Sequence, residues 1–317
     1  MGTPSDPPVL ADVIAAASRI APFAHRTPVL RSRGLDEWLG VRAALKCEHL
    51  QRVGAFKYRG ATNAVQLLSD ADAARGVCAH SSGNHAAALA LAARDRGIAA
   101  HLVMPENVSA VKLAAVRGYG AQVTLCAPTL VAREATVAEV RERTGAIEIH
   151  PYDDPRIIAG AGTAALELLD ECGDLDAVVT PIGGGGLLAG TCVAVHARTP
   201  GIRIVAGEPS GADDAAQSLA TGTLVPQTDP RTIADGLLTS MSARTFGIIR
   251  EHVEQIVTVD DDEIVAAMRV VWQRTKQIIE PSAAVAVAAV RSAVFAPGTN
   301  VGIVLSGGNV DLDALPW

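Results

Sequence analysis

Short stretches of strand character alternate with longer stretches of helical periodicity over most of this sequence. The predicted strands are 43–48, 76–81, 99–105, 121–127, 146–151, 176–182, 202–209 and 301–308. The predicted helices are 58–68, 84–97, 109–118, 129–144, 157–171, 187–198, 261–276 and 281–294. Several of the strands are continuous apolar runs, as in parallel sheets that are covered on both faces. This alternation predicts right-handed strand–helix–strand crossovers and a doubly wound α/β fold.

The length and composition of the chain fit this fold class. A chain of 317 residues is long enough for two domains or for one large α/β unit. Hydrophobic residues make up 49% of the chain but aromatic residues only 3%, so the core must consist mainly of Ala, Val, Leu and Ile. The segment 210–245 is rich in Asp, Gly, Thr and Ser, and we predict a loop-rich insert there. Asp260 and Glu263 predict a capping box for the helix that follows.

Charge and cysteine usage argue against several classes of protein. The formal net charge is -7 and no long basic run is present, so nucleic acid is not an expected partner. The five cysteines are scattered without a C-x-x-C pair, which indicates reduced thiols rather than a disulfide framework. The sequence does not start like a signal peptide, and no apolar run approaches the roughly 18 residues of a membrane helix. We therefore expect a cytoplasmic protein with no membrane partner.

Four consecutive glycines, Gly183–Gly186, follow one predicted strand and open the next predicted helix. Bare backbone N–H groups at a helix N-terminus suit a phosphate or another anion, and a merely flexible turn is the alternative. Gly184, Gly186 and Ala189 also fit the spacing of a dinucleotide fingerprint, with Glu208 at the end of the next strand as a ribose-binding acid. On this unit alone, a nicotinamide-dependent oxidoreductase is a second interpretation.

Two further loops at predicted strand ends carry polar groups. In HSSGNHA, at 80–86, hydroxyls, an amide and helix N-terminal N–H groups suit a substrate carboxylate. Simple N-capping by Ser82 or Asn84 is the alternative. In LSGGNVD, at 305–311, the two glycines permit the close approach of a ligand or simply form a tight turn. The nicotinamide interpretation leaves both loops unexplained.

One lysine, Lys57, stands in the stretch GAFKYRG, although a lone lysine is ordinarily a solvated surface charge. Together with SSGNH, GGGG and SGGN in this order and spacing, it resembles the pyridoxal-phosphate enzymes of the tryptophan-synthase-β fold type. Within that group the sequence is most similar to the serine racemases and the serine/threonine dehydratases. The resemblance extends from TPVL at 27–30 to LSGGNVD, and includes TIADGL at 232–237 and IIEPSAAVAVAAV at 278–290.

The resemblance implies a fold and a division into domains. Two doubly wound α/β domains would hold the cofactor in the cleft between them, as in fold type II pyridoxal-phosphate enzymes. The large cofactor-binding domain would comprise residues 1–66 and 149–317, and the small substrate-side domain residues 67–148. The resemblance also implies a homodimer.

The resemblance further implies a role for each motif residue. Lys57 would form the Schiff base with the cofactor, and Ser82 would be a second catalytic residue on the opposite face of the substrate α-carbon. The implied cofactor-binding residues are Phe56, Lys57, Asn84, Gly183, Gly184, Gly185, Gly186, Leu187 and Ser306. The implied substrate-binding residues are Ser81, Ser82, His85 and Arg133. The lysine role is physically sound, because a nucleophilic amine must be neutral and burial beside Phe56 would lower its pKa.

The activity implied by the resemblance is that of an ammonia-lyase, which would convert L-serine or L-threonine into a 2-oxo acid and ammonia. Amino acid racemisation and dehydration of 3-hydroxyaspartate are enzymatic alternatives, and a cofactor-carrying or amino-acid-sensing protein is a non-enzymatic one. Residues 52–55 read Arg-Val-Gly-Ala where many relatives carry Lys-Thr-Gly-Ser, which argues against nucleotide activation. Because no regulatory-domain pattern follows LSGGNVD, we also expect no feedback inhibition by isoleucine.

The stretch EPSGADD implies a divalent-cation site. In the resembling enzymes this stretch would hold Mg²⁺, Mn²⁺ or Ca²⁺ through the carboxylates of Glu208 and Asp214 and the carbonyl of Ala212. Hard cations prefer oxygen ligands, and Mg²⁺ keeps several waters where few carboxylates are present. A solvated acidic loop, in which Asp213 or Asp214 caps the next helix, is the alternative.

Overall fold

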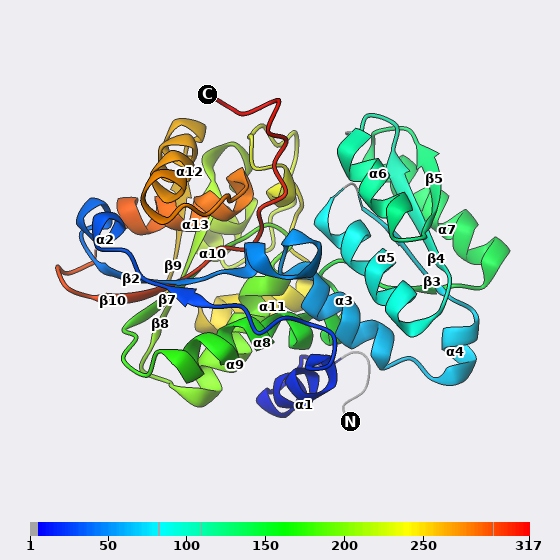
Figure 1. Cartoon of the computed structure of the whole chain (residues 1–317), viewed down its shortest axis with the longest axis horizontal. Helices are drawn as coiled ribbons and strands as arrows, with labels where there is room; N and C mark the ends of the chain where they lie inside the picture. The colour runs from blue at the N-terminus through cyan, green and yellow to red at the C-terminus, as the bar shows by residue number, and fades with distance from the viewer. Residues whose placement is uncertain (1–5, 82, 109, 294) are drawn as a thin grey trace.

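The chain forms two lobes, each built on an open parallel sheet (Figure 1). The computed structural model describes residues 6–81, 83–108, 110–293 and 295–317. Within these residues the larger sheet has the strand order β1-β2-β10-β7-β8-β9, and the smaller sheet has the order β5-β4-β3-β6. Neighbouring strands pair in parallel, apart from the antiparallel pair of β1 with β2. The doubly wound α/β class is therefore confirmed, whereas the exact domain boundaries stay a prediction.

The elements follow one another in strand–helix order. The strands are β1 (Val29–Leu30), β2 (Arg42–Lys46), β3 (Val77–His80), β4 (Ala100–Pro105), β5 (Gln122–Cys126), β6 (Ile147–Glu148), β7 (Ala177–Pro181), β8 (Arg203–Pro209), β9 (Gln255–Val259) and β10 (Asn300–Val304). The main helices are α1 (Leu10–Ile20), α2 (Arg33–Leu39), α3 (Lys57–Gln66), α4 (Asp70–Ala74), α5 (Asn84–Arg96), α6 (Ala110–Gly118), α7 (Leu130–Thr144), α8 (Pro155–Glu171), α9 (Gly186–Arg198), α10 (Asp214–Thr221), α11 (Ala243–His252), α12 (Asp261–Thr275) and α13 (Pro281–Ser292).

The continuous apolar strands are explained by helices on both faces of the larger sheet. In β7, Ala177 and Val179 face a core shared with α2, α12 and α13, whereas Val178 faces a core shared with α1, α8 and α9. Successive side chains of a strand point to opposite faces, so a strand that is covered on both sides must be apolar throughout. Alanine, valine, leucine and isoleucine dominate both cores, as the low aromatic content predicts.

Some predicted elements have different limits in the structure. The predicted strand 146–151 is shortened to β6, because the chain turns at His150, whose Nδ1 accepts the backbone N–H of Asp153 at 2.8 Å. The predicted loop-rich insert contains α10, and α11 begins at its end. The elements α1, α2, α4, α10, α11, β1 and β9 had no predicted counterpart. The capping box of Asp260 and Glu263 is confirmed, since each side chain bonds the other residue's backbone N–H.

The helix that starts at Lys57 lies between the two lobes (Figure 1). This helix, α3, packs against α5 of the smaller lobe and α8 of the larger lobe. Gly60 and Gly160 make the second contact possible, because a Cβ on Gly160 would lie 2.7 Å from the Gly60 Cα. Close approach of two helix backbones requires glycine on at least one side.

A buried ion-pair network anchors α3 to the larger lobe. The Arg59 guanidinium donates to both carboxylate oxygens of Glu48, at 2.7 and 2.8 Å, and to both of Glu167, also at 2.7 and 2.8 Å. Lys46 donates to Glu167 at 2.7 Å. The side chains of Arg59 and Glu48 are completely buried, so their charges depend on each other for solvation. The network thus anchors α3 to the larger lobe at Arg59, two residues after Lys57.

Candidate active site

Lys57 has the surroundings of a reactive amine. Its Nζ donates a hydrogen bond to the carbonyl oxygen of Pro151 at 2.9 Å and lies 5.1 Å from the centroid of the Phe56 ring. Burial lowers the pKa of Lys57 to about 8. A buried lysine loses water around its ammonium form, so the neutral, nucleophilic form becomes accessible near physiological pH.

Phe56 joins three of the loops that the sequence singled out. Its ring packs against a small apolar cluster of Ala161, Leu187 and Val304. Its backbone N–H donates to the carbonyl of Ser306, at the end of β10, at 2.9 Å. The lysine loop, the helix that follows the glycine loop and the carboxyl end of β10 therefore meet at one place, as expected for a ligand site in an open α/β sheet.

The four glycines form a strand–helix junction whose backbone is closely covered by other groups. A Cβ on Gly184 would lie 2.3 Å from the ring of Tyr152, and one on Gly186 would lie 2.9 Å from the Tyr152 Cβ. Gly185 is the N-cap of α9 and has a φ of 84°, a conformation that L side chains rarely adopt. The merely flexible turn is therefore not the explanation for these glycines. Their N–H groups at the start of α9 form a cradle suited to a phosphate.

We expect Gly184→Ala to weaken the binding of a phosphate-bearing cofactor by about 10- to 100-fold, because overpacking costs of 1–3 kcal/mol are typical. The added methyl group would push the loop away from the Tyr152 ring and displace the N–H groups at the start of α9. Titration of the cofactor-free protein with pyridoxal phosphate measures the effect. Gly247→Ala is the matched control, since a Cβ at that helical position meets nothing within 4 Å. Equal cofactor affinities for the two variants would contradict the cradle.

Asn84 begins α5 and is held from the larger lobe. Its Nδ2 donates to Glu280 at 2.8 Å, and its Oδ1 accepts from the Nδ2 of Asn309 at 2.8 Å. Burial, together with the nearby charge of Asp235, raises the pKa of Glu280 to about 7. Glu280 and Asn309 lie in the stretches IIEPSAAVAVAAV and SGGN, but sequence reasoning gave neither residue a role. They fix the side chain that the resemblance assigns to the cofactor ring.

The predicted substrate-side residues surround the carboxyl end of β3. Ser81 follows this strand, and its Oγ accepts the N–H of Gly83 at 3.3 Å. The Nε2 of His85 donates to the carbonyl of Ile149 at 3.0 Å, and burial lowers the pKa of His85 to about 3. His85 is therefore neutral and supports the segment that carries Pro151. Ser82, the predicted second catalytic residue, lies outside the described residues.

Arg133, the remaining predicted substrate-binding residue, lies in the first turn of α7. Its Nε is buried and has no hydrogen-bond partner within the described part of the chain. The charge of Arg133 is close enough to lower the pKa of His80, the last residue of β3, although burial is the larger cause of that shift. A cationic donor at the carboxyl end of the smaller sheet is therefore available to an anionic ligand.

The segment that follows β6 also borders the candidate site, and sequence reasoning gave Pro151 in this segment no role there. Pro151 accepts the hydrogen bond of Lys57, and Tyr152 covers the glycine loop. The ring of His150 packs edge-on against Tyr152 with 4.6 Å between centroids. This segment also follows the carboxyl end of a strand, so the rule that identified the other three loops could have found it.

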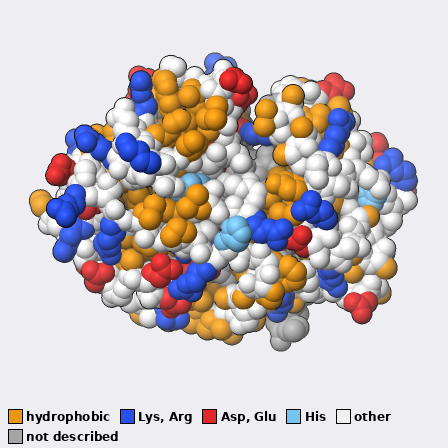
Figure 2. Space-filling model, in the orientation of Figure 1, with side chains coloured by type: hydrophobic (Ala, Val, Ile, Leu, Met, Phe, Trp, Pro, Cys, Tyr) orange, Lys and Arg blue, Asp and Glu red, His pale blue; other side chains and the backbone are white. Residues whose placement is uncertain are grey.

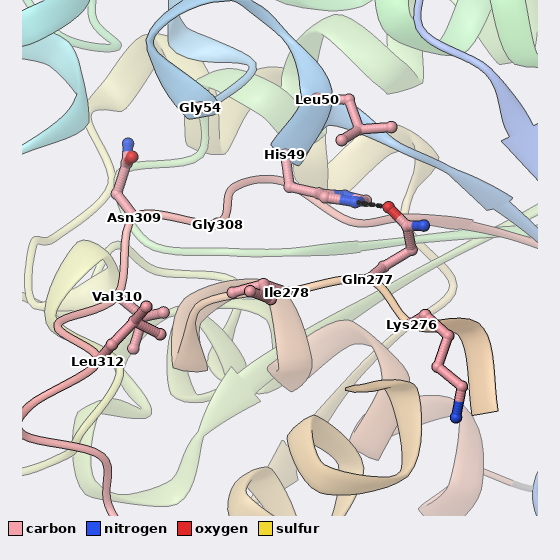
Figure 3. Close-up of a pocket in the computed structure, with 10 residues that line it drawn as sticks. All are labelled: His49, Leu50, Gly54, Lys276, Gln277, Ile278, Gly308, Asn309, Val310 and Leu312. Atoms are coloured by element: carbon pink, nitrogen blue, oxygen red, sulfur yellow. Dashed lines mark hydrogen bonds between the residues drawn. The ribbon is translucent and has the colours of Figure 1, made fainter. Parts of the chain in front are cut away.

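Two cavities flank the loop that leads into Lys57. The rear cavity, about 510 Å³, is lined by Gly54 and Asn309 and by His49, whose Nε2 bonds Gln277 at 2.9 Å (Figure 3). The cleft cavity, about 750 Å³, has Asn84 and Tyr119 of the smaller lobe on its wall and also reaches Gly54. On the face shown in Figure 2 the surface is hollowed between the lobes. The lysine loop therefore has open space on two sides.

Comparison with known proteins agrees with this geometry. A two-lobed parallel α/β fold, with a lysine and a glycine cradle between the sheets, is the arrangement of fold type II pyridoxal-phosphate enzymes. The family model described as "Pyridoxal-phosphate dependent enzyme" matches residues 20–307. The chain belongs to that family, and the nicotinamide interpretation is wrong.

Individual relatives span almost the whole chain. A beta-hydroxyaspartate dehydratase of Paracoccus denitrificans (strain Pd 1222) is 47% identical over 312 residues, covering 98% of this chain and 99% of that protein. The structure of maize serine racemase aligns with a TM-score of 0.95 at 42% identity, covering 97% of this chain and 95% of the other. A threonine deaminase structure from T.th. aligns with a TM-score of 0.92 at 45% identity, covering 96% of this chain and 99% of the other. The chain is thus an enzyme of the lyase and racemase group.

The sequence also made predictions about the membrane, the oligomeric state and the location of the protein in the cell. Within the described residues, every helix falls short of the length and apolar character that a membrane span needs. The homodimer and the cytoplasmic location stay predictions.

Proposed function

We propose that this enzyme eliminates water from a β-hydroxy amino acid, and that the resulting imino acid then takes up water and gives ammonia and a 2-oxo acid. The main observation behind this proposal is the setting of Lys57. This lysine has a lowered pKa and donates a hydrogen bond to Pro151 beside Phe56, where the two lobes meet. Bound pyridoxal phosphate would supply the electron sink for the substrate α-carbon. In this proposal the glycine cradle holds its phosphate, and Asn84 and Ser306 hold its ring. The neutral amine of Lys57 takes the α-proton, and the β-hydroxyl leaves as water once it has accepted a proton.

Ser306 supports elimination over racemisation. It is buried and lies two residues after β10, and we propose that its hydroxyl faces the ring nitrogen. A neutral hydroxyl stabilises negative charge less well than an acidic partner would. A weaker sink favours rapid loss of the β-hydroxyl over slow reprotonation of the α-carbon. Racemisation remains the alternative activity, with Ser82 as its second acid/base, and chiral analysis for D-serine tests it in the same assay.

L-serine and L-threonine are the simplest substrates, but Arg133 favours 3-hydroxyaspartate. A buried guanidinium nitrogen without a partner costs free energy, and a carboxylate satisfies it well. Only a dicarboxylate leaves one carboxylate for Arg133 when the other is held by the N-terminal region of α5. The relative that is a beta-hydroxyaspartate dehydratase supports the same choice.

A substrate panel tests this proposal. With purified enzyme and added cofactor, we expect keto acid and ammonia from 3-hydroxyaspartate with a higher kcat/KM than from L-serine or L-threonine. Arg133→Met should raise KM for 3-hydroxyaspartate by roughly 10- to 100-fold, the worth of one charged hydrogen bond, and change KM for L-serine much less.

Arg141→Met is the matched control, because Arg141 lies on the same helix and pairs with Glu148 at 3.0 Å. If Arg133→Met raised KM equally for L-serine and for 3-hydroxyaspartate, Arg133 would not bind the second carboxylate. Absence of keto acid from every member of the panel would overturn the elimination itself.

The proposed divalent-cation site has unusual carboxylates. Glu208 is the second-last residue of β8, and its two oxygens accept the backbone N–H groups of Ala215 and Ala216 at 2.9 and 2.8 Å. Asp214 has one buried oxygen, Oδ2, without a hydrogen-bond partner in the described part of the chain. Burial raises the pKa of Glu208 to about 8 and that of Asp214 to about 6.

Two buried, mutually repelling carboxylates fit a cation that would neutralise them. Among the described residues no set of three or more His, Cys, Asp or Glu side chains is placed to hold a metal, so the Ala212 carbonyl and waters would complete the ligands. Because Glu208 already caps α10, the predicted capping by Asp213 or Asp214 does not occur through their side chains. We propose that Mg²⁺, Mn²⁺ or Ca²⁺ at this site ties α10 to the sheet.

We expect chelator to lower both Tm and kcat/KM, and Mg²⁺ or Mn²⁺ to restore both. Asp214→Asn should reproduce the chelated state and respond to neither treatment, because it removes a proposed ligand but leaves the cap of α10 intact. Asp213→Asn is the matched control, since its carboxylate accepts from Gln217 on the surface at 2.8 Å. If the wild-type enzyme has the same Tm and kcat/KM with and without chelator, the site is absent.

A further inference from the structure

The loop that leads into Lys57 contains backbone conformations that need outside support. Val53 has a φ of 58° and Gly54 a φ of 71°. A β-branched residue at positive φ is a true outlier and persists only where its surroundings hold it there. Val53 packs against the core of the smaller lobe, but Gly54 lines both the rear cavity and the cleft cavity, so packing supports only part of this loop.

Backbone contacts with the SGGN loop hold the middle of this segment. The Nδ2 of Asn309 donates to the Val53 carbonyl at 2.7 Å, and the N–H of Gly308 donates to the Gly54 carbonyl at 2.9 Å. These bonds fix the backbone of residues 53 and 54. They do not involve Arg52 or Tyr58, which lie at the two ends of the segment around Lys57.

Three side chains hold the two ends of the segment. The Tyr58 hydroxyl donates to Asp95 Oδ2 at 2.5 Å. The Nη1 of Arg52 donates to the same Asp95 oxygen at 2.7 Å and to the Tyr58 hydroxyl oxygen at 2.8 Å. The Arg52 guanidinium carbon lies 4.9 Å from the centroid of the Tyr58 ring. We call these three residues the Asp95 cluster.

The Asp95 cluster connects Lys57 with the smaller lobe. Asp95 lies in the last turn of α5, the same helix that begins with Asn84. Tyr58 is completely buried and directly follows Lys57 in the chain. Burial, with the Asp95 hydrogen bond, raises the pKa of Tyr58 above its ordinary value, so the hydroxyl remains a donor at working pH. One carboxylate on α5 therefore holds both residue 52 and residue 58.

We propose that Asp95 is a positioning residue that, through Arg52 and Tyr58, fixes the loop before Lys57 and the direction of the lysine amine. This inference rests on the proposed role of Lys57 but not on which amino acid is the substrate. None of the three side chains needs to touch the substrate. The cluster acts by preventing residues 52–56 from moving into the two adjoining cavities.

The first test uses the holoenzyme variant Asp95→Asn, which keeps the size of the side chain and removes its charge. We expect kcat to fall by roughly tenfold or more, since a displacement of about 1 Å can cost up to 100-fold. KM should change by less than about threefold, because uniform substrate binding is untouched. The visible circular dichroism of the lysine-linked cofactor should weaken as well, because this signal reports its orientation in the site. Asp170→Asn, which removes an exposed ion pair with Arg198, should change none of these quantities.

The second test is Tyr58→Phe, which deletes only the hydroxyl and decides the question if Asp95→Asn does not fold. We expect the same direction of change in kcat and in the dichroism. The double variant should lose no more than the worse single variant, because the residues act as one unit. The proposal would be overturned if the single variants had a lowered Tm but wild-type kcat and dichroism. It would also be overturned if the losses of kcat in the two single variants added up in the double variant. If the wild-type enzyme turned over no amino acid in the panel, the proposed function would fail, and the dichroism would still decide the role of the cluster.

Discussion

Lys57→Ala is expected to lower kcat/KM by at least about a thousandfold, the combined size of a covalent and a general-base contribution. It should also abolish the visible absorbance band of the lysine-linked cofactor. The reason is the setting of the amine, which is buried beside the Phe56 ring, is held by the Pro151 carbonyl and has its pKa lowered to about 8. Absorbance spectroscopy and steady-state assays of the purified variant measure both effects.

The glycine cradle should still bind the cofactor in this variant, because the groups packed nearest to Gly184 and Gly185 belong to Tyr152, Thr245 and Ile249 and not to Lys57. Equilibrium dialysis with pyridoxal phosphate separates loss of chemistry from loss of binding. Lys276→Gly is the control, since Lys276 is exposed and its φ of 62° suits glycine. If Lys57→Ala retained the band and turnover, another lysine would carry the reaction. Lys46 is ion-paired with Glu167 and Lys112 with Asp235, so neither is expected to do so.

The second large effect is expected from Arg59→Ala, which should lower the free energy of unfolding by about 3–5 kcal/mol. Removal of the guanidinium would leave the completely buried carboxylate of Glu48 uncompensated and take two donors from Glu167. A buried, unpaired charge is among the costliest defects a folded chain can contain. Urea denaturation followed by circular dichroism gives the change directly.

Arg198→Ala is the matched control for this experiment. Arg198 also pairs with a carboxylate, that of Asp170 at 3.1 Å, but both side chains are about 42% exposed. Exposed ion pairs contribute about 1 kcal/mol or less, so the control should unfold almost like the wild type. Equal losses in the two variants would mean that burial of the Arg59 network is not what stabilises α3.

The fold class of this enzyme and the positions of its ligand-binding loops could be predicted from short sequence segments. Alternation of apolar strands with helical stretches requires a parallel sheet covered on both faces, and the chain folds that way in both lobes. The glycines at 183–186 and the polar loops after β3 and β10 follow strand ends, where an open α/β sheet binds ligands. Elements without such a signal were missed, notably α10, a short helix in a polar stretch, and β9 at the edge of the larger sheet.

The sequence by itself determined which residue types could form a pyridoxal-phosphate site, because glycine backbone freedom, a strand–helix junction and a lysine beside an aromatic ring are properties of short segments. Only the tertiary structure decided how these residues are held. Asn84 is fixed by Glu280 and Asn309, which are 196 and 225 residues away, and Lys57 by Pro151, 94 residues away. Asp95 reaches Tyr58 across 37 residues. Such contacts depend on how two sheets and the helix between them pack, and no local propensity encodes that packing.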